Sequence, residues 1–300
     1  MRFRVLALSA FLQLYSIQCF ADLPMTVEDL LTQSNQFRLS LDLGYANVDR
    51  RNTDRYFHLV QTGTSNFIML PVAISEQRQN SDTLTMTLSA RYGLNNKTEL
   101  YSHLTATSNS SRIYANKKSS SVNSQQLSQL VVGTNHQFSE DNDSPALLAF
   151  AEVALAENTA IDGTDYQHFK TGQIGFTTYR SIDPLVLSLS AGYRQSWRRP
   201  NGVNQVDPGD LLFINPSIGF AVNNQVTLTG GVQFKFRGKD KIDGSELGIR
   251  TSQTNLELGF GYASSEQLTI NLSIRNDISG NTGAQANLRL LYKIKSFTQQ

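Results

Sequence analysis

The segment Asn135, His136 and Ser139 holds the residue types with which a lipid-hydrolysing enzyme activates a serine nucleophile. A nucleophile and its base must share one face and lie within hydrogen-bond reach of each other. His136 and Ser139 are three positions apart, and on a β-strand such residues point to opposite faces. The sequence therefore does not predict an enzyme, and lipid hydrolysis remains only an alternative.

Other chemistry of this kind has little support. The remaining histidines, His58, His103 and His168, are isolated and match no metal-binding spacing, and no glycine-rich phosphate loop is present. A formal net charge of +1 over 300 residues lacks the basic excess of a nucleic-acid binder. We therefore expect no cofactor, no metal site and no nucleic-acid partner.

Charged residues recur at alternate positions within apolar segments, which places them on one face of a strand. On the inside of a pore, such side chains form rings or ladders of charge that set selectivity. The candidates for lining a lumen are Asp42, Arg91, Glu99, His103, Glu152, Arg194, Lys235, Glu257, Arg275, Arg289 and Lys293. Positive side chains outnumber negative ones, which predicts a mild preference for anions. Alternatively, opposite charges pair across the lumen and only stabilise it.

The elements that would hold these residues are strands with strict apolar–polar alternation. Such a period of two is typical of strands with one face toward lipid and the other toward a polar lumen. The alternating segments cover residues 37–45, 84–92, 100–104, 130–138, 147–155, 174–176, 185–193, 212–220, 226–236, 256–262, 268–274 and 286–294. Several apolar faces end in tyrosine, for example Tyr45, Tyr92 and Tyr262, as in the aromatic girdles of outer-membrane barrels.

The connections alternate between tight and long. Tight ones are expected at 95–97, 140–144, 180–183, 223–224 and 264–266, and long polar ones at 47–81, 108–125, 157–168, 195–209, 238–253 and 276–284. Short periplasmic turns and long extracellular loops are typical of outer-membrane barrels. We therefore expect an all-β fold over residues 36–297, a transmembrane antiparallel β-barrel of about twelve strands, give or take two.

Two features leave the details of this barrel open. Pro216 cannot donate a hydrogen bond to a strand ladder, so we expect a bulge there. The apolar run from Phe67 to Ile74 lies in the longest loop. It could extend strands above the membrane, fold into the barrel mouth or add a hairpin.

The N-terminus has the order of regions of a secretory signal. Arg2 and Arg4 precede a short apolar stretch, and Cys19-Phe20-Ala21 forms a small-x-small cleavage site. Residues 1–21 are therefore expected to be a signal peptide, cleaved near Ala21 on the way to the bacterial outer membrane. Cys19 is the only cysteine, so the mature chain would have no disulfide.

Residues 22–35 lack strand alternation and predict a short helix. Thr26 and Asp29 have the spacing of a capping box, and Val27, Leu30 and Leu31 share one helical face. Such a helix could plug the barrel from inside. The alternative is a loosely ordered periplasmic tail, because so short a helix is marginal in water.

The C-terminal third resembles a broad family of small proteobacterial outer-membrane proteins. The resemblance rests on residues 255–262, the turn after them, residues 268–273 and the final strand. That family includes barrels associated with aromatic meta-cleavage pathways and the secretion channel of functional-amyloid systems, which also places a helical plug before twelve strands. This chain departs from those secretion channels by lacking a long coiled-coil N-terminal region. It also ends on Thr298-Gln299-Gln300 after Phe297 instead of on an aromatic residue.

These observations indicate a channel or transporter for passive passage of small solutes or of an exported polypeptide. A structural or adhesive barrel with a closed lumen is the main alternative. Expected partners are outer-membrane lipid, the barrel-assembly machinery and, in a homo-oligomer, further copies of the chain. Lipopolysaccharide phosphates could be bound by the loop cations Arg50, Arg51, Arg198, Arg199, Lys239 and Lys241.

Overall fold

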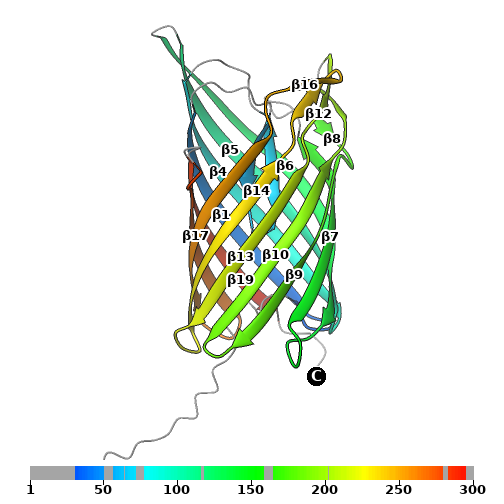
Figure 1. Cartoon of the computed structure of the whole chain (residues 1–300), viewed down its shortest axis with the longest axis vertical. Helices are drawn as coiled ribbons and strands as arrows, with labels where there is room; N and C mark the ends of the chain where they lie inside the picture. Colours follow the sequence, from blue (N-terminus) through cyan, green and yellow to red (C-terminus); the bar gives the residue numbers. More distant parts are fainter. Residues whose placement is uncertain are drawn as a thin grey trace, which may run out of the picture.

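The computed structural model describes residues 31–50, 57–63, 65–71, 78–115, 118–158, 165–201, 203–279 and 283–294. Its dominant feature is a closed antiparallel barrel of 12 strands (Figure 1). The prediction of an all-β transmembrane barrel with this strand count is confirmed. Over the same residues, no helix is long and apolar enough to cross a membrane.

The barrel strands follow one another around the ring in chain order. They are β1 (Phe37–Arg50), β4 (Arg78–Asn95), β5 (Thr98–Ala115), β6 (Lys118–Ser139), β7 (Ala146–Asn158), β9 (Thr171–Ile182), β10 (Leu185–Ser196), β13 (Leu211–Ala221), β14 (Val226–Arg237), β17 (Thr251–Ala263), β18 (Leu268–Asp277) and β19 (Gly283–Ile294). The first and last strands close the ring, with pairs from Phe37–Ile294 to Val48–Gly283. Closure leaves no free sheet edge, which is what a strand structure in lipid requires.

The alternation expected from the sequence separates the two faces of the wall. Leu39, Leu43 and Leu88 are exposed on the outside, whereas Asp42 and Thr87 are buried. The strand register places apolar residues beside apolar residues on neighbouring strands: Leu41 lies opposite Leu88, and Leu88 lies opposite Leu104. The outer face is therefore a continuous apolar surface suited to lipid, and the inner face is mostly polar.

The tight turns that join β4–β5, β6–β7, β9–β10, β13–β14 and β17–β18 all lie at one end, together with the end of β19 (Figure 1). By the rule for outer-membrane barrels this is the periplasmic end. The predicted tight connections are thus confirmed.

One predicted long loop is wrong. Residues 108–125 were expected to be loop, but β5 and β6 stay paired from Thr98–His136 out to Ala115–Lys118. This stretch is rich in Ser and Asn and has no apolar face. A two-stranded extension that stands above the membrane needs no such face, because water solvates both of its sides.

The bulge expected at Pro216 is not present. β13 pairs with β14 at Ile214–Phe234 and again at Ser217–Gly231, so no residue is inserted between these pairs. The ladder instead omits Asn215 and Pro216. A missing donor therefore interrupts the hydrogen bonding without shifting the register.

The extracellular connections carry strands of their own. β11 (Arg199–Asn201), β12 (Asn204–Asp207), β15 (Asp240–Ile242) and β16 (Ser245–Leu247) form a four-stranded sheet in that order. β8 (Tyr166–Gln167) pairs antiparallel with the last two residues of β7 at the same end. The sheet stands at the rim above β10, β13 and β14 (Figure 1).

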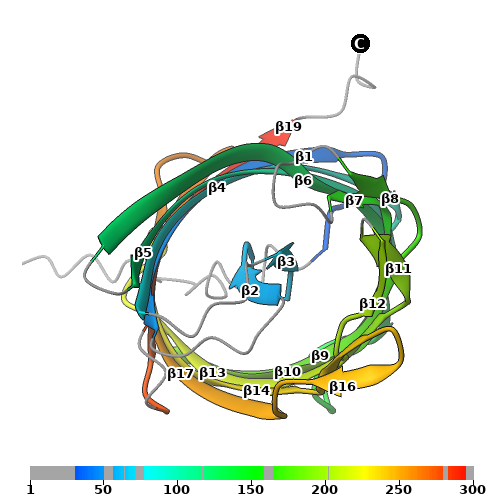
Figure 2. The ribbon, with the colours of Figure 1, turned by 90° about the horizontal axis from the view of Figure 1, so that it is seen from above.

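The apolar run of the longest loop forms a hairpin inside the barrel. β2 (Phe57–Gln61) pairs only with β3 (Phe67–Pro71) among the described residues. Seen along the barrel axis, both strands lie within the ring (Figure 2). Of the three possibilities left open by the sequence, folding into the barrel is the one observed, and β2 and β3 add no strands to the barrel wall.

The segment before β1 reaches the lumen at the periplasmic end. Ser34 forms an isolated bridge with Gly93, and the amide of Thr32 donates to Glu99 Oε2 over 2.7 Å. Residues 31–36 contain no helix. Of the predicted plug residues, Leu31 lies in this non-helical stretch, while Val27 and Leu30 lie outside the described residues, where the helix stays a prediction.

The lipid-facing assignment can be tested with a charge in the middle of the wall. Leu88→Arg is expected to lower the free energy of unfolding by about 2–4 kcal/mol, because the outer face there meets hydrocarbon. Val222→Arg, in the exposed β13–β14 turn, serves as the control and should cost about 1 kcal/mol or less. Urea unfolding in lipid vesicles measures both, and equal costs would show that Leu88 does not face lipid.

Candidate functional site

The β2–β3 hairpin packs against the barrel wall through Phe67. This side chain is 1% exposed and lies against Leu211 and Phe213, which point inward from β13. The Phe67 and Phe213 ring centroids are 5.2 Å apart. Burial of apolar surface is favourable by about 25 cal/mol per Å². This contact therefore stabilises the hairpin within the lumen.

Met69 extends the apolar contact toward the extracellular sheet. It packs with Val206 of β12, and Leu59 and Ile242 lie against the same pair. A separate cluster is formed by Val60, Ile68 and Leu70. The hairpin is thus held both by the barrel wall and by the sheet above it.

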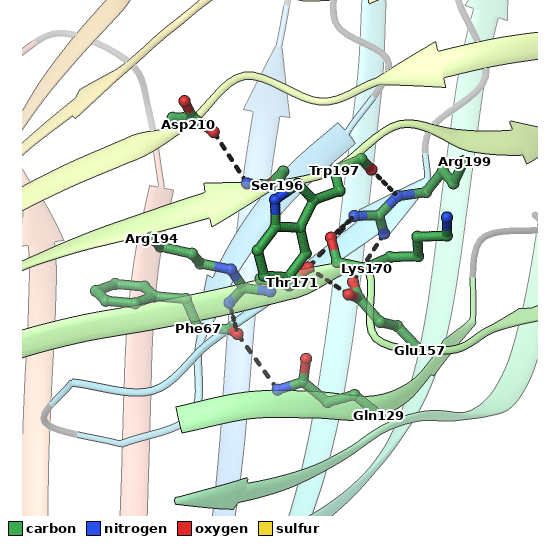
Figure 3. Close-up of polar contacts among 10 residues, drawn as sticks. All are labelled: Phe67, Gln129, Glu157, Lys170, Thr171, Arg194, Ser196, Trp197, Arg199 and Asp210. Carbon is green, nitrogen blue, oxygen red and sulfur yellow. Dashed lines mark hydrogen bonds and ion pairs between the residues drawn. The ribbon is translucent and has the colours of Figure 1, made fainter. Parts of the chain in front are cut away.

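Polar side chains of the wall bind backbone carbonyls near the hairpin turn. The carbonyl of Phe67 accepts hydrogen bonds from Arg194 Nη1 and from Gln129 Nε2, the latter at 3.3 Å (Figure 3). Gln173 Nε2 donates to the carbonyl of Ser65 over 2.9 Å. Buried carbonyls need such partners, so three wall residues fix the hairpin in one position.

Lys235 adds a contact of a different kind. Its Nζ lies 5.8 Å from the centroid of the Phe67 ring, within the range of a cation–π interaction. Lys235 and Arg194 are both predicted lumen residues, and each is at most 4% exposed. Both cations bind the hairpin directly.

A buried ion pair lies above this contact. Arg199 Nη1 is 2.9 Å from Glu157 Oε1, and Arg199 Nη2 donates to the carbonyl of Lys170 over 2.8 Å (Figure 3). Thr171 also donates to Glu157. Arg199 is only 1% exposed, so its inclusion among the loop cations that could bind lipopolysaccharide phosphates is wrong. It ties β11 to β7 instead.

Below the hairpin the barrel encloses a cavity of about 310 Å³. The hairpin turn forms its roof with Gln61, Gly63, Ser65 and Asn66. Six of the predicted lumen residues line its wall: Arg91, His103, Glu152, Glu257, Arg275 and Arg289. The cavity therefore extends from the hairpin into the part of the barrel nearer the periplasm.

Three of the predicted lumen carboxylates are paired with arginines. Arg289 Nε lies 2.5 Å from Asp42 Oδ1, and Arg275 Nη2 lies 2.8 Å from Glu257 Oε1. The third pair, Arg91 with Glu99, is separated by 3.3 Å. These charges both line the lumen and pair locally.

The other predicted lumen residues have separate partners. Tyr101 donates to Glu152 Oε2 over 3.1 Å, and His103 Nδ1 is 2.7 Å from Ser89 Oγ. Lys293 lies opposite Arg38 in the β1–β19 ladder. Six of the predicted lumen charges therefore form three ion pairs, and a seventh, Glu152, accepts a hydrogen bond from Tyr101.

The volume of the cavity comes from small inward residues that the charge pattern did not single out. They are Ser188, Ser190, Ser217, Gly219, Gly231, Gly259, Gly261 and Ser273. On this side of the barrel the inner wall is therefore almost flat. In the sequence, this cavity is indicated by glycine and serine at the inward-facing positions of neighbouring strands.

The segment considered for lipid hydrolysis has no catalytic pairing. His136 Nδ1 lies 2.9 Å from Thr98 Oγ1, and the His136 ring packs edge-on against Phe138. Ser139 Oγ donates to the carbonyl of Pro145 instead. Within the described part of the chain, no three His, Cys, Asp or Glu side chains lie close enough to hold a metal ion.

The pattern of charged residues did not predict the contacts of the hairpin with the wall. Phe150, Leu211 and Phe213 occupy the polar phase of their strands, where a water-facing lumen does not favour apolar residues. Together with the apolar run at Phe67, they were a signal for a segment docked inside the barrel.

Comparison with known proteins agrees with this architecture. A family model described as "Putative MetA-pathway of phenol degradation" matches residues 99–292, from β5 to β19. The crystal structure of an outer membrane channel from Pseudomonas putida F1 aligns with a TM-score of 0.61 at 9% identity, covering 88% of this chain and 97% of that one. The translocator domain of the autotransporter NalP from Neisseria meningitidis aligns with a TM-score of 0.53 at 7% identity, covering 88% and 90%. At these identities the structures share the fold, and no curated protein matches the sequence.

The docking of the hairpin can be tested at Arg194. Arg194→Met keeps the length of the side chain and removes the charged donor to Phe67, a loss of about 1.5–3 kcal/mol. Amide hydrogen exchange across β2 and β3 is then expected to be roughly ten- to a hundred-fold faster. Arg112→Met, on the exposed β5 extension, is the matched control. Unchanged exchange in Arg194→Met would mean that this contact does not hold the hairpin.

Proposed function

The chain belongs to the family described as "Putative MetA-pathway of phenol degradation", and we propose that it is a passive outer-membrane channel for small solutes. The observation that carries this proposal is the lumen itself. A cavity walled by glycine and serine is roofed by a separate hairpin that contacts the wall through side chains. In this proposal the barrel is the pore and the hairpin its closure.

The rival reading is a structural barrel with a permanently closed lumen. Narrow barrels of that kind are filled by the side chains of their own strands. Here the described part of the lumen is closed chiefly by the β2–β3 hairpin. The turn of this hairpin is anchored by only a few side chains of the wall, notably Arg194, Gln129 and Gln173. Such an anchor can be released without opening the wall, which favours a channel.

The cavity also supports a class of solute. A volume of about 310 Å³ suits a small molecule, since ligand pockets span about 300–1,000 Å³. Tyr101, Phe150 and Tyr179 offer aromatic contacts on its wall. The family description refers to phenol degradation. We therefore propose small aromatic solutes, in preference to an exported polypeptide.

The charges of the lumen add a preference for anions to this proposal. Asp42, Glu99 and Glu257 are each neutralised by an arginine. Arg194 and Lys235 have the hairpin as partner instead. Moving the hairpin aside would leave these two cations facing the path. We propose that neutral and anionic aromatics pass more readily than cations.

Removal of the hairpin tests the channel directly. In planar bilayers the full chain is expected to conduct rarely, whereas a variant with residues 57–71 replaced by a Gly-Ser linker should conduct steadily. The control shortens the β5–β6 extension, which lies outside the lumen, and should behave like the full chain. Under a salt gradient, the reversal potential of the hairpin-free variant should indicate anions, and Lys235→Gln should reduce that preference.

Two outcomes would contradict the proposal. No conductance from folded hairpin-free protein, either with or without residues 22–35, would show that the lumen is closed by its own wall. Conductance that shows no ion selectivity and is unaffected by Lys235→Gln would contradict the proposed anion preference. The proposal of a pore would still stand.

A further inference from the structure

A second hollow lies on the outer side of the barrel at its extracellular rim. It has a volume of about 1010 Å³ and is bounded by β10, β13, β14 and the segments that carry the four-stranded sheet. Its lower part is apolar and its upper part is cationic. Neither part belongs to the lumen.

The apolar floor is a row of neighbouring outward side chains. Tyr193 lies opposite Leu212, and Leu212 lies opposite Phe236, in adjacent strand pairs. Each of the three is at least 42% exposed on the lipid side, and Trp197 completes the floor at 39%. Aromatic residues at this height are typical of the membrane interface.

The upper part gathers cations from three separate segments. Arg198 follows β10, Lys241 lies in β15, and Arg250 precedes β17. All three are exposed. Over the described residues, no hydrogen bond or ion pair engages their side chains, whereas Lys239 binds Glu246 over 2.6 Å. The hydrogen bond and charge of Lys239, with the charges of Lys241 and Arg250, lower the pKa of Glu246.

Two of the nearby acidic groups are occupied in holding this shape, and a third, Asp207, lies opposite Lys241 in the β12–β15 ladder. Asp210 accepts from Tyr193 Oη at 2.6 Å and from the amide of Ser196 at 2.9 Å. Asp240 pairs with Arg237 and accepts from the amide of Gly209 at 2.8 Å. These contacts fix the backbone of the segments on both sides of the hollow, from which the three cations project.

We propose that this hollow binds the phosphorylated glycolipid of the outer leaflet, with lipid A phosphates on Arg198, Lys241 and Arg250. Its acyl chains would lie along Tyr193, Leu212 and Phe236. An apolar floor directly below a cluster of cations matches an amphipathic anion, whereas a free phosphate would use only the upper part. Charge-assisted hydrogen bonds from arginine to phosphate are among the strongest available to such a site.

The structure also reduces the number of loop cations that can bind a lipopolysaccharide phosphate. Arg198 and Lys241 remain free for a phosphate, and Arg250 joins them. Arg199 is buried against Glu157, and Lys239 is paired with Glu246. Arg51 and the side chain of Arg50 lie outside the described residues.

The test measures binding of purified lipid A to the detergent-solubilised full chain by native mass spectrometry. Arg198→Gln/Lys241→Gln should weaken binding about ten-fold or more, because two charged hydrogen-bond donors are lost. Lys97→Gln/Arg112→Gln removes the same charge elsewhere and should change binding less than about two-fold. The shift in gel mobility on heating shows that each variant is folded.

Two further arms identify the source of the phosphate. Dephosphorylated lipid A should bind the unaltered chain about ten-fold more weakly or worse, and inorganic phosphate should not displace lipid A. Equal weakening by both double variants would overturn the proposal as a mere effect of net charge. Equal binding of dephosphorylated lipid A would overturn it in favour of acyl contacts alone, and displacement by phosphate would overturn it in favour of a free-anion site.

Discussion

The absence of water in the bilayer core governs this fold. Every backbone N–H and C=O in the membrane needs a partner within the protein, and strands can provide one only in a closed ring. The β1–β19 ladder completes that ring. Alternation of side chains along each strand then gives one face to lipid and the other to the lumen. Leu88 and Thr87, adjacent in sequence, thus occupy opposite environments.

A wall whose neighbouring strands are paired around the whole ring cannot open easily, so in the proposed channel the control of passage falls to segments outside the wall. The β2–β3 hairpin meets this requirement, because among the described residues its strands pair only with each other. Phe67 is its main attachment, in contact with Phe213, Arg194, Gln129 and Lys235. One residue therefore combines an apolar anchor, a hydrogen-bonded backbone carbonyl and a cation–π contact. In the proposed channel, the hairpin is the closure and the barrel wall is the pore.

The sequence predicted what depends on local pattern. Alternation such as Leu39, Leu41 and Leu43 identified the strands, the count and the two faces, because lipid imposes that pattern at every position. The alternation did not predict the extension of β5 and β6, because strands surrounded by water need no apolar face. Nor did it place the hairpin: the run at Phe67 fits several locations, and only the inward Leu211 and Phe213, distant in sequence, select the lumen.

The account is tested most directly by locking the hairpin in place. Ser65→Cys/Gln173→Cys joins two residues already linked by a hydrogen bond of 2.9 Å from Gln173 Nε2 to the Ser65 carbonyl, and a short cleavable thiol-reactive linker can bridge them. We expect the linked protein to stay closed in planar bilayers at voltages that open the unlinked form, and cleavage of the linker to restore conductance. Equal conductance in both states would show that the hairpin does not close the pore.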